Sequence, residues 1–143
     1  MASIEKTKQY LTDFKIHPSF QRIAIMKYLF ENPVHPTADE IHTALVAVIP
    51  TLSKTTVYNT LSLLSQAGAI KELTIDEKQL HYDGYIREHA HFRCNNCGKI
   101  IDVAIDNDTL KIESLEKEHN IIITDTQVFY KGYCNECKNK FNY

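Results

Sequence analysis

The stretch TADEIHTALVAVIPTLSKTTVYNTLSLL, residues 37–64, contains two helical patterns separated by a short turn. Thr37 followed by Glu40 fits a capping box, in which the hydroxyl and the carboxylate each satisfy a free backbone N–H at a helix start. Apolar residues then recur at helical spacing until Pro50 ends the pattern. Ser53 is placed to cap a second helix. The stretch therefore predicts a helix-turn-helix.

The second predicted helix has two different faces. One face is apolar and consists of Val57, Leu61 and Leu64. The opposite face is polar, carries a single cation and suits the major groove of DNA, where such side chains reach phosphates and base edges. With Arg22 from an upstream helix, the residues expected to contact DNA are Arg22, Ser53, Lys54, Thr55, Tyr58 and Asn59. A face that is merely solvated is the alternative.

The flanking sequence extends this pattern into a winged helix over residues 1–84. After Gly68 the apolar period changes to two, in two runs around a turn at residues 76–78, which predicts a hairpin. Upstream, Ser19 can cap a helix, and residues 4–14 form a weaker helical pattern.

Charge is distributed unevenly along the chain. The net charge is −2, which by itself argues against nucleic-acid binding. Residues 41–71, however, contain no Asp or Glu, and most of the acidic residues lie in the second half. This asymmetry indicates one lobe that faces an anion and another with a different task.

The second lobe, residues 85–143, has a mixed pattern. Strand-like segments occur within residues 90–105 and 121–133, and residues 108–119 form a helical pattern. A lobe of this size buries little apolar surface, so we expect it to dimerise or to rely on a metal. The expected fold class is α+β: an N-terminal winged helix-turn-helix followed by a small α/β dimerisation lobe.

All the cysteines of the chain fall into two C-x2-C pairs. Cys94 and Cys97 form one pair, and Cys134 and Cys137 form the other. Each pair can chelate from a tight turn, and four thiolates favour a structural Zn²⁺ site. A redox-active dithiol is the alternative, but no thioredoxin-like βαβ pattern precedes the first pair.

Two histidines lie just before the first cysteine pair. His89 and His91 are separated by one residue, so on a strand they project to the same face and can reach one metal. Exposed His-x-His also occurs without metal, and the pair alone is only suggestive.

Four segments together resemble the ferric uptake regulator family. They are HPTADEI at 35–41, TTVYNTL at 55–61, HAHFRCNNCGK at 89–99 and CNEC at 134–137, in the family's order over nearly the whole chain. The resemblance implies a dimeric, metal-responsive bacterial transcription regulator and not an enzyme. It implies a structural zinc held by Cys94, Cys97, Cys134 and Cys137. It also implies a regulatory metal held by His35, Asp83, His89, His91 and Asp102.

This regulatory set of imidazoles and carboxylates suits Fe²⁺ or Mn²⁺ and can also take Zn²⁺ or Ni²⁺. A further site of some family members has no counterpart here, because its positions are Ala90, Thr109 and Thr126. The acid at Asp102, with His35 and Asp83, resembles the peroxide-responsive branch. In that branch bound Fe²⁺ reacts with H₂O₂ and a ligand histidine is oxidised, here His35 or His89.

The resemblance implies a homodimeric repressor that binds a palindromic double-stranded operator when the regulatory metal fixes the angle between the lobes. An iron- or manganese-responsive uptake regulator of the same family is the main competitor. A zinc-ribbon or dithiol oxidoreductase and a metal-buffering protein are alternatives from other classes. No signal peptide or membrane span is visible, so a cytoplasmic protein is expected, with no membrane partner and no small-molecule substrate besides metal and H₂O₂.

Overall fold

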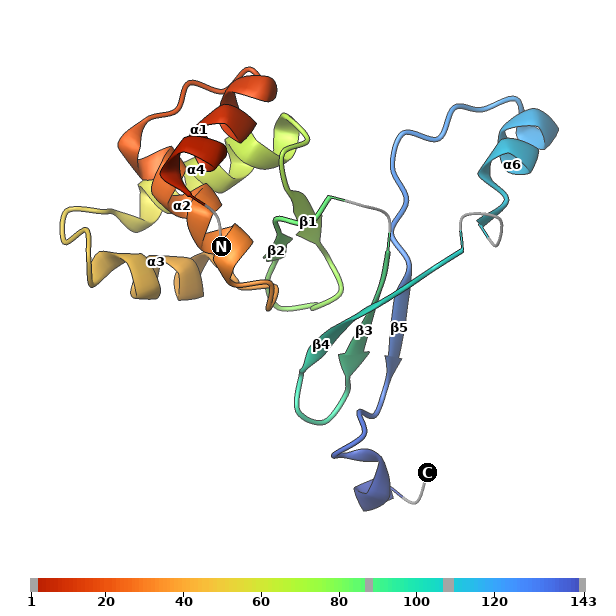
Figure 1. Ribbon diagram of the computed structural model, residues 1–143. Helices are drawn as coiled ribbons and strands as arrows, with labels where there is room; N and C mark the ends of the chain where they lie inside the picture. Colours follow the sequence, from red (N-terminus) through yellow and green to blue (C-terminus); the bar gives the residue numbers. More distant parts are fainter. Residues whose placement is uncertain (1–2, 87–88, 107–109, 142–143) are drawn as a thin grey trace. The chain divides into compact units, whose positions relative to one another are not determined.

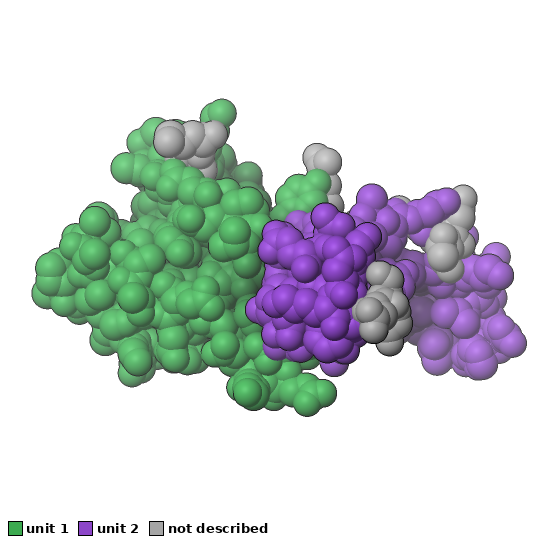
Figure 2. Space-filling model, turned by 90° about the horizontal axis from the view of Figure 1, so that it is seen from below, with its two compact units in different colours: residues 1–86 green, residues 87–143 purple. Residues whose placement is uncertain are grey.

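The computed structural model describes residues 3–86, 89–106 and 110–141. The chain divides into two compact units, Met1–Ile86 and Arg87–Tyr143, which Figure 2 shows in different colours. In the described ranges, every helix is too short or too polar to cross a bilayer.

Unit 1 contains four helices and a hairpin (Figure 1). Each helix begins directly after a Ser or Thr whose side-chain oxygen accepts a hydrogen bond from a backbone N–H three residues later. These caps explain where the helices start, because the first N–H groups of a helix have no partner inside it. The helices are α1 (Ile4–Asp13), α2 (Phe20–Glu31), α3 (Ala38–Val46) and α4 (Lys54–Gln66).

The helices of unit 1 enclose one apolar core. The apolar face predicted for α4 is confirmed, since Val57, Leu61 and Leu64 are each 0% exposed. They belong to one cluster with Leu11, from α1, and with side chains from α2 and α3. Burial of this many apolar side chains is the main source of stability for unit 1.

The predicted hairpin forms, with shorter strands than its apolar alternation suggests. Strand β1 (Lys71–Leu73) pairs antiparallel with β2 (His81–Asp83). Ile75 is buried and Leu80 is 38% exposed, and both lie in the connecting turn. The segment before α3 also joins β2, because the Tyr82 amide donates to the Pro36 carbonyl. The wing is therefore attached to the start of α3.

Unit 2 contains a three-stranded sheet with β3 (Ala90–Cys94) at its centre. Strand β4 (Ile100–Val103) pairs with β3 antiparallel, and β5 (Phe129–Gly132) pairs with it parallel (Figure 1). Helix α6 (Ile112–His119) and a short 3₁₀ helix, η1 (Lys138–Phe141), complete the described part of the unit. The predicted α+β class is confirmed.

The strand predicted over residues 121–133 is longer than the strand observed. Only β5 is regular, although the His91 amide of β3 also donates to the Val128 carbonyl at 3.0 Å, just before β5 begins. Of the helix predicted over residues 108–119, Leu110 and the residues of α6 are helical, Lys111 interrupts the helix, and Asp108 and Thr109 lie outside the described residues.

Helix α6 buries none of its residues within this chain. Leu115 on α6 is 40% exposed, and Ile122, which follows the helix, is 86% exposed. Large apolar side chains that remain accessible are typical of a surface that another protein covers.

Candidate metal centres and DNA-facing helix

The four cysteines meet at one end of the sheet in unit 2. Cys94 ends β3 and Cys97 lies in the next turn, while Cys134 and Cys137 follow β5. Their sulfur atoms all lie within 4.8 Å of one another, and the Cys97 and Cys134 sulfurs are 3.8 Å apart. Tetrahedral zinc with Zn–S bonds of about 2.3 Å needs sulfur–sulfur distances of about 3.8 Å. The cluster therefore fits a Zn²⁺ ion.

Strand pairing brings the two cysteine turns together. Cys94 of β3 lies beside Gly132 of β5, and the Asn95 amide donates to the Gly132 carbonyl at 2.7 Å. The Cys134 amide then donates to the Cys94 sulfur at 3.4 Å, and the Asn96 side-chain amide donates to the Cys137 sulfur at 3.3 Å. Such donors stabilise sulfur in its anionic form, which is the form that binds metal.

The protein environment gives the thiols of Cys94 and Cys97 different pKa values. Burial raises the pKa of Cys94, but backbone amides of Cys97, Cys134 and Asn96 outweigh it and lower this pKa to about 6. The Lys99 amide lowers the pKa of Cys97, but burial and the neighbouring sulfurs raise it to about 11. One thiolate is thus available near neutral pH, and a metal ion must displace the proton of its neighbour.

A second group of possible metal ligands in unit 2 comes from β3, from β4 and from the residues before β3. His91 is directly opposite Asp102 in the strand register. The Asp102 carboxylate is 3.3 Å from His89 Nε2 and 3.4 Å from His91 Nε2, and the two imidazole rings have centroids 4.4 Å apart. The two histidines therefore share one face, as the spacing predicts, and three donors converge.

Unit 1 holds another pair of donors. His35 Nε2 is 3.6 Å from Asp83 Oδ2, and both side chains are 3% exposed. The other carboxylate oxygen of Asp83 accepts the Tyr85 amide at 2.8 Å, which fixes its orientation. Two buried polar groups of this kind suit a cation, but a metal of the first transition row usually takes at least four donors.

The backbone of His35 is unusual. Its φ of +59° is in the left-handed region, which costs an L-residue roughly 1–2 kcal/mol. The next residues are held to β2 by the Tyr82–Pro36 hydrogen bond and by an isolated bridge between Thr37 and His81. These contacts support the strained position of His35.

The polar face predicted for α4 is accessible. Lys54, Thr55, Tyr58 and Asn59 are exposed, and Ser53 caps the helix through the Thr56 amide. Sequence reasoning missed Asp39 of α3, whose carboxylate accepts the Tyr58 hydroxyl at 3.2 Å and lies 3.9 Å from Lys54 Nζ. Asp39 thereby holds two of the exposed side chains in place.

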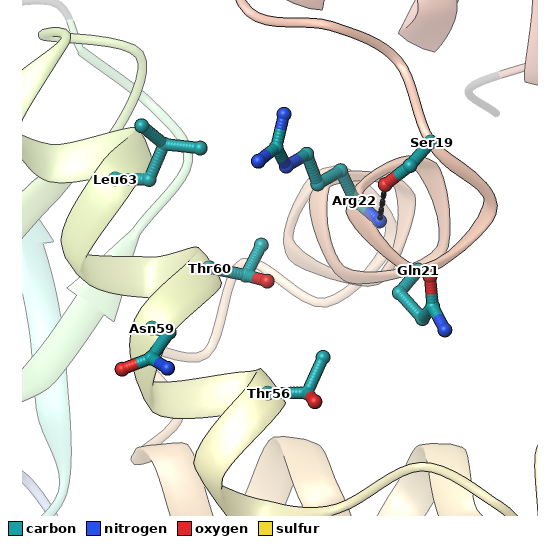
Figure 3. A pocket seen from close by; sticks show the side chains of 7 residues that line it. All are labelled: Ser19, Gln21, Arg22, Thr56, Asn59, Thr60 and Leu63. Atoms are coloured by element: carbon teal, nitrogen blue, oxygen red, sulfur yellow. Dashed lines mark hydrogen bonds between the residues drawn. The ribbon is translucent and has the colours of Figure 1, made fainter.

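A cavity of about 400 Å³ lies between the start of α2 and the middle of α4 (Figure 3). Arg22 and Asn59, predicted from separate helices, both line it, and Arg22 is held there by a hydrogen bond from Nη1 to the His17 carbonyl. Thr60 is only 6% exposed and also faces the cavity. The packing of α2 against α4 creates this cavity, so the sequence pattern did not reveal Gln21 or Thr60 as lining residues.

Within residues 3–86, 89–106 and 110–141, the possible metal ligands group at the sites described above. Of the positions of the additional family site, Ala90 is buried in β3 and Thr126 lies between α6 and β5. Thr109, the other position of the additional family site, lies outside the described residues.

Comparison with known proteins gives a consistent result. Residues 14–131 match the ferric uptake regulator family. The peroxide-responsive repressor PerR of Staphylococcus epidermidis is 37% identical over 123 residues, 85% of this chain and 81% of that protein. The peroxide operon regulator of Bacillus subtilis is 35% identical over 136 residues, covering 92% and 90%. Among solved structures, the Campylobacter jejuni peroxide stress regulator is 27% identical, with a TM-score of 0.71 and coverage of 96% and 100%.

Proposed function

The chain belongs to the ferric uptake regulator family, and from this premise we propose that it is a repressor that binds DNA in response to metal and peroxide. Members of this family are transcription regulators and not enzymes, which sets aside the dithiol oxidoreductase. Metal-dependent regulation is the family's general property. The metal ligands, the DNA contacts and the response to peroxide are our proposal for this chain.

We assign the four cysteines to a structural Zn²⁺. A site of four thiolates has no open position for a substrate, and thiolates prefer zinc over harder cations. The 3.8 Å separation of the Cys97 and Cys134 sulfurs supports this assignment. In this role zinc stabilises the fold and does not sense metal or peroxide levels in the cell.

We assign His35 and Asp83 of unit 1, with His89, His91 and Asp102 of unit 2, to one regulatory ion. The observation that carries this proposal is that each unit presents a converging but incomplete set of imidazole and carboxylate donors. A mixed nitrogen and oxygen set suits Fe²⁺ or Mn²⁺. An ion that needs both sets binds only one arrangement of the units and shifts the population toward it.

DNA binding follows from this arrangement. The exposed residues of α4, with Arg22 at the cavity, are proposed to contact a palindromic operator through a homodimer, in which two copies place α4 at successive half-sites. The exposed apolar side chains on and after α6 support dimerisation through unit 2. Metal then acts as a corepressor, and its loss releases the DNA.

Peroxide sensing is supported by the two relatives whose names describe peroxide responses. When bound, Fe²⁺ would supply the redox chemistry that activates H₂O₂. In the net reaction one oxygen atom of H₂O₂ enters a C–H bond of a ligand imidazole and the other leaves as water. His35 and His89 are the proposed targets, and an oxidised ring is a poorer ligand.

Mass spectrometry tests peroxide sensing. The Fe²⁺-loaded protein, treated with mild H₂O₂ and digested, should gain one oxygen atom on the peptide containing His35 or His89 and lose operator affinity. Protein loaded with Mn²⁺ is the control and should stay unmodified. Intact histidines with reversible Fe²⁺-dependent DNA binding would instead identify an iron- or manganese-responsive regulator.

Substitution on α4 tests the DNA assignment. Replacing Lys54 with Gln removes an exposed cation and should weaken operator binding and lower its salt dependence by about one counterion. Metal uptake should not change. The matched control is Lys8→Gln, which removes an exposed cation from α1, outside both this helix and the hairpin. Equal operator affinity of the Lys54 variant and the unaltered protein would show that the polar face of α4 is only a solvated surface.

A further inference from the structure

We propose that His81 is a positioning residue that orients the metal ligand His35 and connects it to the turn of the wing. All the residues involved lie in unit 1. The proposal rests on the proposed function, because it takes His35 as a ligand of the regulatory ion.

The first contact joins His81 to the backbone of the ligand. His81 Nδ1 is 2.6 Å from the His35 carbonyl oxygen, so the ring N–H donates to that carbonyl. His35 has a positive φ and is almost fully buried, so its carbonyl has few other ways to be satisfied. The hydrogen bond therefore helps to fix the direction in which the His35 ring leaves the backbone.

The second contact joins the same ring to the wing. His81 Nε2 is 3.0 Å from Asp76 Oδ2, and the side chains are 12% and 11% exposed. The other carboxylate oxygen, Asp76 Oδ1, accepts the Lys78 amide at 3.0 Å. One carboxylate oxygen of Asp76 therefore contacts the His81 ring, and the other accepts a hydrogen bond within the turn between β1 and β2.

The contacts form a continuous path of three hydrogen bonds from the His35 carbonyl to the Lys78 amide. Lys78 is exposed, and it lies in the turn of a wing, an element that can reach the DNA backbone. The path is short and its middle is nearly buried, so it is well suited to transmit a change at His35. A bound ion that stiffens His35 would therefore stiffen the turn that carries Lys78.

Two variants of His81 separate the two contacts. Asn places an N–H donor near the position of Nδ1 but is too short to reach Asp76, so His81→Asn should keep the bond to His35 and lose the link to the wing. His81→Phe keeps the ring and loses both contacts. His42→Asn is the matched control, because its Nε2 also contacts a backbone carbonyl, that of Leu52, at 2.9 Å.

The first measurement is Mn²⁺ affinity by titration calorimetry, with the zinc content and the melting temperature checked for each variant. His81→Phe should weaken Mn²⁺ binding about ten-fold, the lower end of the effect seen when partners of metal ligands are removed. His81→Asn should restore affinity close to that of the unaltered protein, and His42→Asn should not change it. Unchanged affinity in His81→Phe, or no rescue by Asn, would overturn the positioning role.

The second measurement is amide hydrogen exchange at Lys78. In the unaltered protein Mn²⁺ should slow this exchange several-fold, whereas in His81→Asn the ion should bind and leave the exchange unchanged. Equal slowing in both proteins would overturn the connection to the wing.

A failure of the proposed function gives a different result. If the unaltered protein binds no Mn²⁺ or Fe²⁺, the regulatory site itself is wrong. The connection is then still tested without metal, because Lys78 should exchange faster in His81→Asn than in the unaltered protein, and equal rates would refute it.

Discussion

The two units are stabilised in different ways. Unit 1 has one extended cluster of buried apolar side chains contributed by all four helices. In unit 2 the buried cluster consists of three cysteines, Cys94, Cys134 and Cys137, with Phe92 and Tyr133 packed against them. Since apolar burial is the main force that stabilises a fold, unit 1 has its own stability, and we propose that unit 2 takes much of its stability from a metal and from a partner.

This difference matches the tasks proposed for the units. A winged helix must present α4 in the same geometry whether or not the regulatory ion is bound, and an apolar core ensures this. A dimerisation unit can depend on zinc without harm, because thiolates hold zinc tightly.

Replacing Cys134 with Ser should have the largest effect. Structural zinc contributes on the order of 10 kcal/mol to folding, so loss of one of four ligands should release zinc and unfold unit 2. Amide exchange should become fast in β3 and β5 while the helices of unit 1 stay protected. Asn135→Ala, in the same turn, is the control. Stoichiometric zinc in the Cys134 variant would refute the four-thiolate site, and unfolding of both units would refute their independence.

Replacing Leu61 with Ala should destabilise unit 1 and leave the zinc site of unit 2 intact. Leu61 is fully buried in the core of unit 1, and such a cavity costs about 2–5 kcal/mol. Denaturant unfolding followed by signals from unit 1 should shift to lower concentration, while zinc content remains complete. Ser62→Ala removes a small exposed side chain next to it and should change little. Zinc loss in the Leu61 variant would show that the core of unit 1 also supports unit 2.

The smallest effect concerns Tyr10, whose hydroxyl donates to the Ala69 carbonyl at 2.6 Å. Burial raises its pKa from 10.0 to about 12, so folding favours the neutral phenol. The stability that unit 1 gains from this neutral phenol is complete below pH 10 and is lost as pH rises through 12. Tyr10→Phe should cost about 1 kcal/mol at neutral pH.

The melting temperature of unit 1 should accordingly fall between pH 10 and 12 in the unaltered protein. In Tyr10→Phe this part of the fall should be absent. Tyr28→Phe, another tyrosine of unit 1, is the control. The same alkaline profile in the Tyr10 variant and the unaltered protein would contradict the role of burial.

Local signals in the sequence were sufficient where a local interaction decides the structure. Ser53 and Thr37 mark helix starts because their side chains bond to N–H groups three residues later. The spacing of His89 and His91 gave their common face, because a strand has a period of two. The cysteine pairs met as predicted.

Interactions between distant parts of the chain were not accessible in this way. The capping pattern of Thr37 and Glu40 gave no role to Asp39, and the contacts of Asp39 with Tyr58 and Lys54 depend on how α3 and α4 pack. No local pattern marks His81, although its ring contacts the carbonyl of a residue 46 positions earlier in the chain. The strand predicted over residues 121–133 was too long because strand length depends on the partner strand.

Strand β3 carries proposed ligands of both candidate metal centres, and this limits how its sequence can change. It pairs His91 with Asp102 of β4, and it aligns Cys94 with Gly132, two residues before Cys134. Inserting one residue into β3 would turn every later side chain to the other face and separate both ligand sets in a single step. A residue inserted between Ile122 and β5 would leave all three strands in register, so this unit should accept an insertion there more readily than in β3, by evolution or by design.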